Sequence, residues 1–255
     1  MISTFWRRVL QGLRRYILVL LLLVAWCVVT WQELLPGFLL PAPWQVLSAF
    51  LADWQLLQGH MWVTLQEAGL GLGLAVIAAL ALAIFMDSFR LVEETVMPLL
   101  VLSQTIPVIA LAPLLVLWFG FGMAPKIILV FLVCFFPMAV GLLTAFKEVD
   151  RDILRLMTSM GASSWQSLWH VKLPAALPAF FAGLRIAVSY AVIGAVIAEW
   201  LGGHAGLGVY MTRVRRSYAF DRMFAVIILV SLISLCLIRL VEYGERKATP
   251  WRDLG

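Results

Sequence analysis

The chain has 255 residues, of which 63% are hydrophobic and only 13% are charged, and its formal net charge is +5. Soluble domains average about half apolar and about a quarter charged residues, so this composition excludes an ordinary soluble protein and indicates an integral membrane protein. Because each helical crossing needs about 20 residues, the length predicts one all-α membrane domain of about six spans, and we expect no second domain.

Six hydrophobic runs follow in chain order, each long enough to cross a bilayer as a helix. They cover residues 16–35, 61–86, 97–118, 126–146, 184–201 and 223–241. The first run follows four arginines, as in a signal peptide, but it is long and lacks a convincing cleavage site, so we expect a retained anchor. The predicted organisation is a cytoplasmic segment 1–15, a transmembrane domain 16–241 with a cytoplasmic loop at about 147–183, and a cytoplasmic tail 242–255.

The positions of Lys and Arg predict the orientation, because cationic loops are retained on the cytoplasmic side. The amino terminus, the loop at Arg90, the loop from Lys147 to Lys172 and the end after Arg239 should be cytoplasmic, whereas 32–60 lacks Lys and Arg. One basic cluster falls on the predicted outer side: Arg213, Arg215, Arg216 and Arg222. Either other helices fix the topology despite this cluster, or the cluster contacts an anionic partner. The net charge requires no nucleic-acid partner.

The loop at 147–183 is a long soluble-looking interruption of the hydrophobic sequence. Apolar residues at helical spacing predict a short amphipathic helix that stops near Gly161: Ile153, Leu156, Met157 and Met160. A second short helix should follow, capped by Ser163 or Ser164, with Trp165 on its apolar side and its extension limited by two prolines, Pro174 and Pro178. Two interpretations stay open: a helix lying on lipid, or an element that enters a groove on a soluble partner.

The third hydrophobic run contains Pro107 and Pro113, each of which removes a backbone donor. A broken helix is tolerated in a bilayer only where protein or water satisfies the freed carbonyls, so this run is a candidate translocation pathway. Ser103, Gln104 and Thr105 precede the first proline and are placed to hydrogen-bond a passing solute, as broken helices do in other transporters. The alternative is that they bond neighbouring helices.

The fifth run carries further candidate pathway residues, namely Ser189, Tyr190 and Glu199. An ionisable group at the position of Glu199 should face the protein interior or a water-filled cavity. Two roles stay open for it: a structural ion pair with Arg213 or Arg216, or a direct part in substrate passage. We expect Glu67 at the membrane boundary or at a helix-packing interface.

No group of residues supports catalysis by the chain itself. His60, His170 and His204 lie far apart in the sequence, the three cysteines lack metal-ligand spacing, and no Gly-x-x-x-x-Gly-Lys-Ser/Thr phosphate loop occurs. We therefore expect a non-enzymatic protein that binds no cofactor or metal. A membrane hydrolase using His170 or Glu199, and a structural membrane protein, are the remaining alternatives.

The cytoplasmic loop resembles that of the permease subunits of type I ATP-binding-cassette (ABC) importers, whose motif joins Glu-Ala-Ala, a glycine and a Leu-Pro pair. Gly161 and Val171-Lys172-Leu173-Pro174 stand at the right separation, although Arg155-Leu156-Met157 replaces Glu-Ala-Ala. Further segments resemble the branch for nitrate, sulfonates, taurine and thiamine precursors, among them Leu40-Pro41-Ala42-Pro43, Ala198-Glu199-Trp200 and Gly206-Leu207-Gly208.

The resemblance implies the type I importer permease fold, with a coupling helix that docks on an ATPase. The residues it assigns to coupling are Arg155, Met157, Met160, Gly161, Ala162, Ser163, Trp165, Leu173 and Pro174. The implied partners are a second copy of the chain, two ABC ATPases that bind ATP and Mg²⁺ at the cytoplasmic face, and a periplasmic or lipid-anchored binding protein outside. The implied location is the bacterial inner membrane.

The resemblance also suggests a substrate. Residues 103–107, 192–202 and 250–252 look most like those of permeases for pyrimidine precursors of thiamine, of the hydroxymethyl- or formylaminopyrimidine type. Lys and Arg are missing from the middle of the predicted spans, so the pathway offers no fixed cation to an anion. Nitrate, sulfonate or taurine is the alternative substrate.

Overall fold

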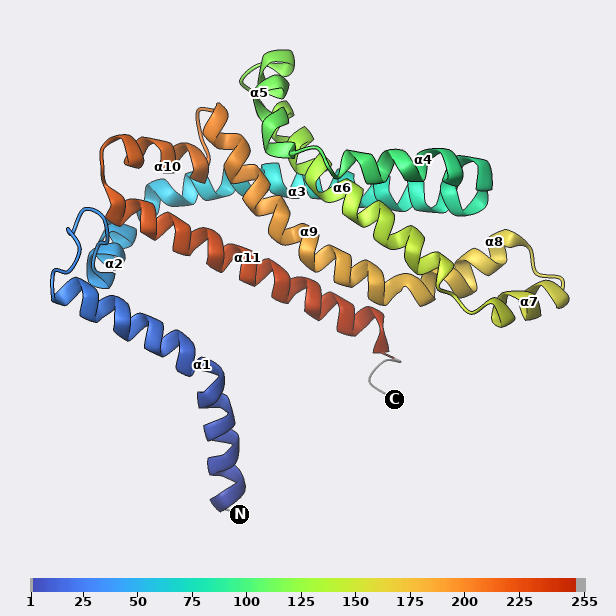
Figure 1. The fold of residues 1–255 in the computed structure, drawn as a ribbon, viewed down its shortest axis with the longest axis horizontal. Coiled ribbons are helices and arrows are strands. Elements are labelled where there is room, and N and C mark those ends of the chain that lie inside the picture. The colour runs from blue at the N-terminus through green and yellow to red at the C-terminus, as the bar shows by residue number, and fades with distance from the viewer. Residues whose placement is uncertain (1, 251–255) are drawn as a thin grey trace. The chain divides into compact units, whose positions relative to one another are not determined.

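The computed structural model describes residues 2–250, with side chains from residue 17 onward, and this part of the chain is helical (Figure 1). In chain order the helices are α1 (Ile2–Trp31), α2 (Pro43–Ala52), α3 (Trp54–Ser88), α4 (Arg90–Ser103), α5 (Val108–Phe119), α6 (Met123–Lys147), α7 (Arg151–Ser159), α8 (Ser164–Ser167), the π-helix η1 (Leu168–Lys172), α9 (Leu173–Leu201), α10 (Leu207–Arg216) and α11 (Phe220–Ala248). The all-α prediction is confirmed.

The predicted spans coincide with long apolar helices. Within the described residues, α3, α6, α11 and the continuous helical stretch Ser164–Leu201 are each long and apolar enough to cross a membrane. The pair α4 and α5 passes the same test as one span bent by 95°, and Ile17–Trp31 of α1 is a shorter apolar helix. These elements occupy the six predicted hydrophobic runs.

The chain divides into two compact units. The smaller contains the described residues up to Leu57 together with Met211–Ile228, and the larger contains Gln58–Tyr210 together with the described residues from Leu229 onward. In the smaller unit the Trp26 indole donates to the carbonyl of Pro41 at 3.0 Å, and Arg222 pairs with Asp53 at 3.3 Å. One arginine of the predicted basic cluster therefore has a carboxylate partner.

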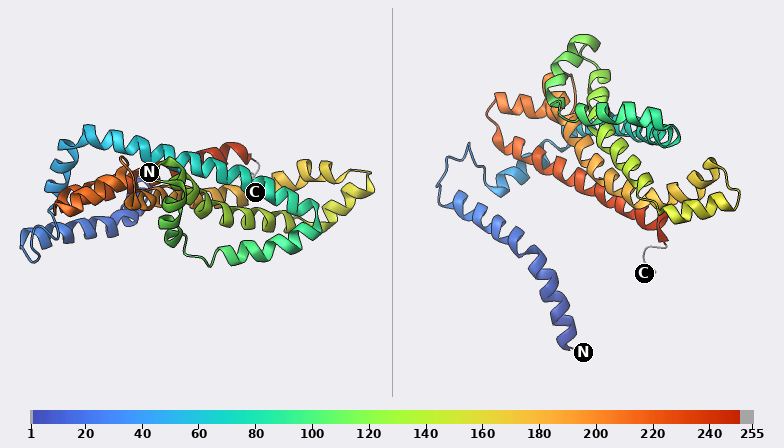
Figure 2. Two further views of the ribbon diagram at one scale, coloured as in Figure 1. Left: turned by 90° about the horizontal axis from the view of Figure 1, so that it is seen from above. Right: turned by 45° about the vertical axis from the view of Figure 1, so that its right-hand side comes forward.

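The core of the larger unit is built from small residues. Helices α6 and α9 lie side by side and make an extensive contact (Figures 1 and 2). Ala75, Ala79 and Ala83 form a fully buried line along α3 at four-residue spacing. A Cβ added at Gly71 would lie only 2.6 Å from the Val130 side chain. Small side chains thus let the helix backbones approach closely, as is typical of membrane proteins.

The third predicted span is broken at one proline only. Helix α4 ends at Ser103 and α5 begins at Val108, directly after Pro107, whereas Pro113 lies inside α5 without ending it. The Ser103 and Thr105 hydroxyls donate to the carbonyls of Leu100 and Leu102, both at 2.7 Å. These local bonds satisfy carbonyls that the broken helix leaves open.

The predicted short helices of the 147–183 loop are α7 and α8. Asp150 caps the start of α7, and the chain leaves it through Gly161 at φ +78°. Ser163 caps α8, and the Gln166 side chain bonds back to the Ser163 amide at 2.8 Å, which forms a capping box.

The expectation that Pro174 and Pro178 end the second short helix is wrong. Helix α8 continues through η1 into α9; Pro174 occupies the first turn of α9 and Pro178 lies within the helix. Proline has no N–H to donate to the preceding turn, and the π-helix replaces the α-helical pattern in the five residues directly before Leu173 and Pro174. The π-turn joins the loop helix and the membrane helix into one continuous stretch.

Candidate functional site

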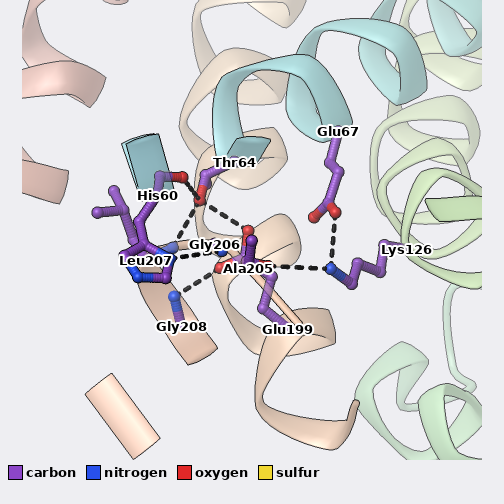
Figure 3. A network of polar contacts seen from close by, with 9 residues as sticks. All are labelled: His60, Thr64, Glu67, Lys126, Glu199, Ala205, Gly206, Leu207 and Gly208. Atoms are coloured by element: carbon purple, nitrogen blue, oxygen red, sulfur yellow. Dashed lines mark hydrogen bonds and ion pairs between the residues drawn. The ribbon is translucent and has the colours of Figure 1, made fainter. Parts of the chain in front are cut away.

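A buried polar network joins α3, α6, α9 and the loop before α10 (Figure 3). On α3, His60, Thr64 and Glu67 follow one another at four- and three-residue spacing, so they share one face of the helix. Glu67 and Glu199 are 0% and 1% exposed, and Lys126 is 4% exposed. Burying three ionisable groups in an apolar bundle is costly unless they bond one another.

Glu199 at the end of α9 accepts two hydrogen bonds. The Thr64 hydroxyl donates to Glu199 Oε1 at 2.7 Å, and the backbone amide of Gly208 donates to Oε2 at 2.5 Å. The Gly208 amide lies in the first turn of α10, where a carboxylate is stabilised by the helix dipole and by open N–H groups. Glu199 therefore ties α9 to the start of α10.

Side chains of α3 and α6 hold the same segment of the chain. The amide of Leu207 donates to the Thr64 hydroxyl at 2.9 Å, and the amide of Gly206 donates to His60 Nδ1 at 2.9 Å. The Lys126 ammonium donates to Glu67 Oε1 at 2.7 Å and to the carbonyl of Ala205 at 3.4 Å. Three helices thus bind four consecutive residues, Ala205 to Gly208, at the end of the loop and the start of α10.

Glycines allow this loop to approach the carboxylate. Gly206 adopts φ +124°, and a Cβ added there would overlap the Glu199 carboxyl group. A Cβ at Gly208 would overlap the carbonyl oxygen of Val196. The segments Ala198-Glu199-Trp200 and Gly206-Leu207-Gly208, separate motifs in the sequence, form one structural unit.

The second candidate region is the loop of α7 and α8. Its apolar residues point away from this chain: Met160 is 76% exposed, Trp165 61% and Leu156 60%. Arg155 pairs with Asp152, three residues before it, at 3.1 Å. Short amphipathic helices whose apolar side chains are this exposed need a lipid surface or a protein partner.

The same loop is connected to the helical core. Leu173 packs on the buried cluster of α3, α6 and α9, and Pro174 is half-buried beside it. The Lys172 ammonium pairs with Asp87 at the end of α3 at 2.8 Å, beside a cleft of about 490 Å³ that Ala162 and Trp165 also line. Displacement of the loop would therefore reach the membrane helices through Leu173 and Lys172.

The predicted pathway residues do not all lie together. Ser103, Gln104, Thr105 and Pro107 form the break between α4 and α5, and Gln104 and Thr105 are exposed. Ser189 is half-buried and Tyr190 is 48% exposed on α9. Glu199, by contrast, is enclosed by the network.

Sequence reasoning missed Lys126, Thr64 and His60. Glu67 was expected at a boundary or packing interface, and it is fully buried at such an interface with Lys126 as its partner. The polar spacing of His60, Thr64 and Glu67 along an apolar helix was the available signal.

Comparisons with known proteins identify a family and several relatives of this chain. Residues 71–250 match the family described as "Binding-protein-dependent transport system inner membrane component". A probable ABC transporter permease protein of Haemophilus influenzae is 40% identical over 225 residues, which cover 88% of this chain and 92% of the relative. The formylaminopyrimidine transport permease ThiX of Halalkalibacterium halodurans is 36% identical over 96% of this chain and 98% of its own.

Other relatives are named for the transport of other solutes. The riboflavin transport permease RibX of Chloroflexus aurantiacus and the taurine transport permease TauC of Escherichia coli are each 35% identical, covering 91% and 92% of this chain and 87% of their own. A crystal structure of a bacterial ABC transporter for the import of alginate matches the fold with a TM-score of 0.67 at 16% identity, over 94% of this chain and 99% of that chain.

The fold is that of a multi-pass membrane protein, and the family match defines a component of a transport system. The chain belongs to the binding-protein-dependent transport system inner membrane component family. It is the permease subunit of an ABC importer in the inner membrane and not an enzyme, and it works with an ATPase, which binds the ATP, and a binding protein.

Proposed function

We propose that this permease imports a pyrimidine precursor of thiamine, of the hydroxymethyl- or formylaminopyrimidine type. The observation that carries the proposal is the alignment with the formylaminopyrimidine permease over 96% of this chain and 98% of the relative. The nearly complete coverage includes the pathway and both regions described above.

The charges of the larger unit favour a neutral or weakly polar solute over a sulfonate. Lys126 is bonded to Glu67, Arg185 on α9 pairs with Glu245, and Lys147 at the end of α6 pairs with Glu93. A cation already paired with a carboxylate is a poor binding group for an anionic substrate. Taurine is therefore the weaker candidate, and riboflavin is the competitor suggested by an equally similar relative.

The loop of α7 and α8 is proposed as the coupling element. Its exposed apolar residues Leu156, Met160 and Trp165 would enter a groove on the ATPase, and Gly161 would set the angle between the two short helices. Arg155, Met157, Ala162 and Ser163 complete the docking surface, and Leu173 and Pro174 transmit its movement to α9. This assignment places the loop and both termini in the cytoplasm.

The permease is proposed to work as a homodimer. One chain supplies one coupling loop, and an importer with two ATPases needs two such loops. The break at Ser103–Pro107, together with Ser189 and Tyr190, would line the pathway between the two copies. Closure of the ATPases around ATP would favour one of two states of that pathway, and hydrolysis would return it to the other.

Uptake by energised cells tests the substrate assignment. Cells with and without this gene would receive labelled formylaminopyrimidine, taurine or riboflavin in parallel. We expect loss of pyrimidine uptake alone, restored by the plasmid-borne gene. Loss of taurine or riboflavin uptake with pyrimidine uptake intact would overturn the substrate and leave the permease class in place.

A further inference from the structure

The buried network contains more negative charge than its cation balances. Within the network of Figure 3, the carboxyl groups are Glu67 and Glu199 and the single cationic side chain is Lys126. His60 Nδ1 accepts a hydrogen bond from the Gly206 amide, and an imidazole nitrogen that accepts carries no proton, so His60 adds no charge through this atom. With both carboxyl groups ionised, the site would hold one uncompensated negative charge.

One oxygen of the network lacks a donor. Among the described residues, none donates a hydrogen bond to Glu67 Oε2, although the Glu67 side chain is fully buried. Glu67 Oε1 receives the Lys126 ammonium, and both oxygens of Glu199 receive bonds from Thr64 and Gly208. An unsatisfied buried carboxylate oxygen is costly, so its partner needs to be identified.

The second carboxyl group of the network, that of Glu199, lies near the Glu67 side chain. Glu67 and Glu199 are close enough for a side-chain hydrogen bond between them. Two carboxylates cannot bond one another when both are ionised, because each is an acceptor only, whereas a protonated carboxyl group donates one O–H. The negative charges of two neighbouring carboxylates also repel one another strongly in a water-poor site.

We propose that Glu67 and Glu199 form a proton-binding site that holds a single proton between their two carboxyl groups, with the Lys126 ammonium balancing the remaining charge. One proton satisfies both deficits: it supplies the missing donor and reduces the net charge of the site to zero. It also needs no cavity, unlike a water molecule or a metal ion. The site is independent of the proposed substrate and orientation.

The proton also strengthens the attachment of the loop before α10. A neutral site keeps Glu199 beside the amide of Gly208 without repulsion from Glu67. The same Lys126 that balances the pair holds the Ala205 carbonyl. The contacts that balance the charge of the two carboxyl groups therefore also hold the loop before α10 in place.

Infrared spectroscopy of the whole purified chain in lipid nanodiscs at neutral pH tests the proposal. Carbon-13 labelling of glutamate would assign the carbonyl stretch of a protonated glutamic acid. We expect this band in the wild-type protein and its loss in both Glu67→Gln and Glu199→Gln, because the remaining carboxylate then pairs with Lys126. Glu94→Gln, at an exposed position, is the matched control and should retain the band.

The test is specific because the band must be lost in both glutamine variants. Absence of the band from the wild-type protein would overturn the proposal, since a water molecule or another donor would then serve Glu67 Oε2. Survival of the band in either glutamine variant would also overturn it, because the proton would belong to one residue alone. Lys126→Met should strengthen the band, since both carboxyl groups then need a proton, and a weaker band would contradict the charge balance.

Discussion

Glu199 at the end of α9 and Gly208 in the first turn of α10 are joined by a 2.5 Å hydrogen bond from the Gly208 amide to the glutamate Oε2. The contact is possible because position 208 has no side chain: a Cβ there would overlap the carbonyl of Val196 and lie 2.9 Å from the Glu199 Cβ. The hydrogen bond to Glu199 therefore requires a glycine nine residues further along the chain, at position 208.

Gly208→Ala should destabilise the larger unit by about 1–3 kcal/mol, the usual cost of overpacking a tight site. Gly73→Ala is the matched control, because a Cβ at Gly73 meets nothing within 4 Å. Thermal unfolding of the detergent-purified protein should show a lower midpoint for the first variant and an unchanged or higher one for the second. Equal midpoints would mean that the loop does not approach α9 as described.

Lys126→Met should be among the most damaging single changes, because removing one partner of a buried pair typically costs about 3–5 kcal/mol. The double variant Glu67→Gln/Lys126→Met should recover much of that loss, since only one buried carboxyl group, Glu199, then needs a proton. For comparison, Arg90 and Glu94 form an exposed pair at 2.8 Å. Arg90→Ala should leave the unfolding midpoint almost unchanged, because exposed ion pairs contribute little to stability. A single Lys126 variant as stable as the double variant would contradict the network.

Gln104→Leu should impair transport without affecting folding, because Gln104 is exposed in the break between α4 and α5. Loss of one hydrogen bond to the solute corresponds to about 0.5–1.5 kcal/mol, or about a 2- to 10-fold rise in KM for uptake. Thr95→Ala, on α4 and outside the break, is the control, since its hydroxyl donates to the carbonyl of Leu91. Unchanged kinetics in the glutamine variant would remove this break from the pathway.

Met160→Glu should weaken the association with the ATPase, because Met160 is 76% exposed and would be buried against the partner. Met160→Leu keeps an apolar side chain and serves as the control. Co-purification of a tagged ATPase with each variant measures the effect. Equal recovery with both would indicate that α7 lies on lipid.

The sequence predicts the spans well because hydropathy over about 20 residues is a local property. The starts of α7 and α8 are equally local, since Asp150 and Ser163 cap helices within three residues of themselves. The continuation of α8 into α9 through the π-helix was not predictable from Pro174, because the turn depends on how the neighbouring helices pack.

Local sequence patterns do not predict the polar network. Lys126 and Glu67 are 59 residues apart, and Thr64 and Glu199 are 135 apart, so only the packing of α3, α6 and α9 reveals them as partners. Sequence reasoning expected Glu199 to face the protein interior or a water-filled cavity, and the structure buries it in the interior at 1% exposure. It did not foresee that Thr64 and Gly208 would bind it.

The loop of α7 and α8 is proposed to couple an ATPase to solute import through this chain. The direct measurement compares labelled pyrimidine uptake and ATP hydrolysis in proteoliposomes that carry the complete transporter with wild-type, Gly161→Val or Gly161→Asn permease. Gly161 has φ +78°, a conformation that asparagine tolerates and that is strained for valine, although nothing lies within 4 Å of an added Cβ. We predict that the valine variant hydrolyses ATP without import and that the asparagine variant retains both activities. Normal ATP-driven uptake by the valine variant would contradict the claim.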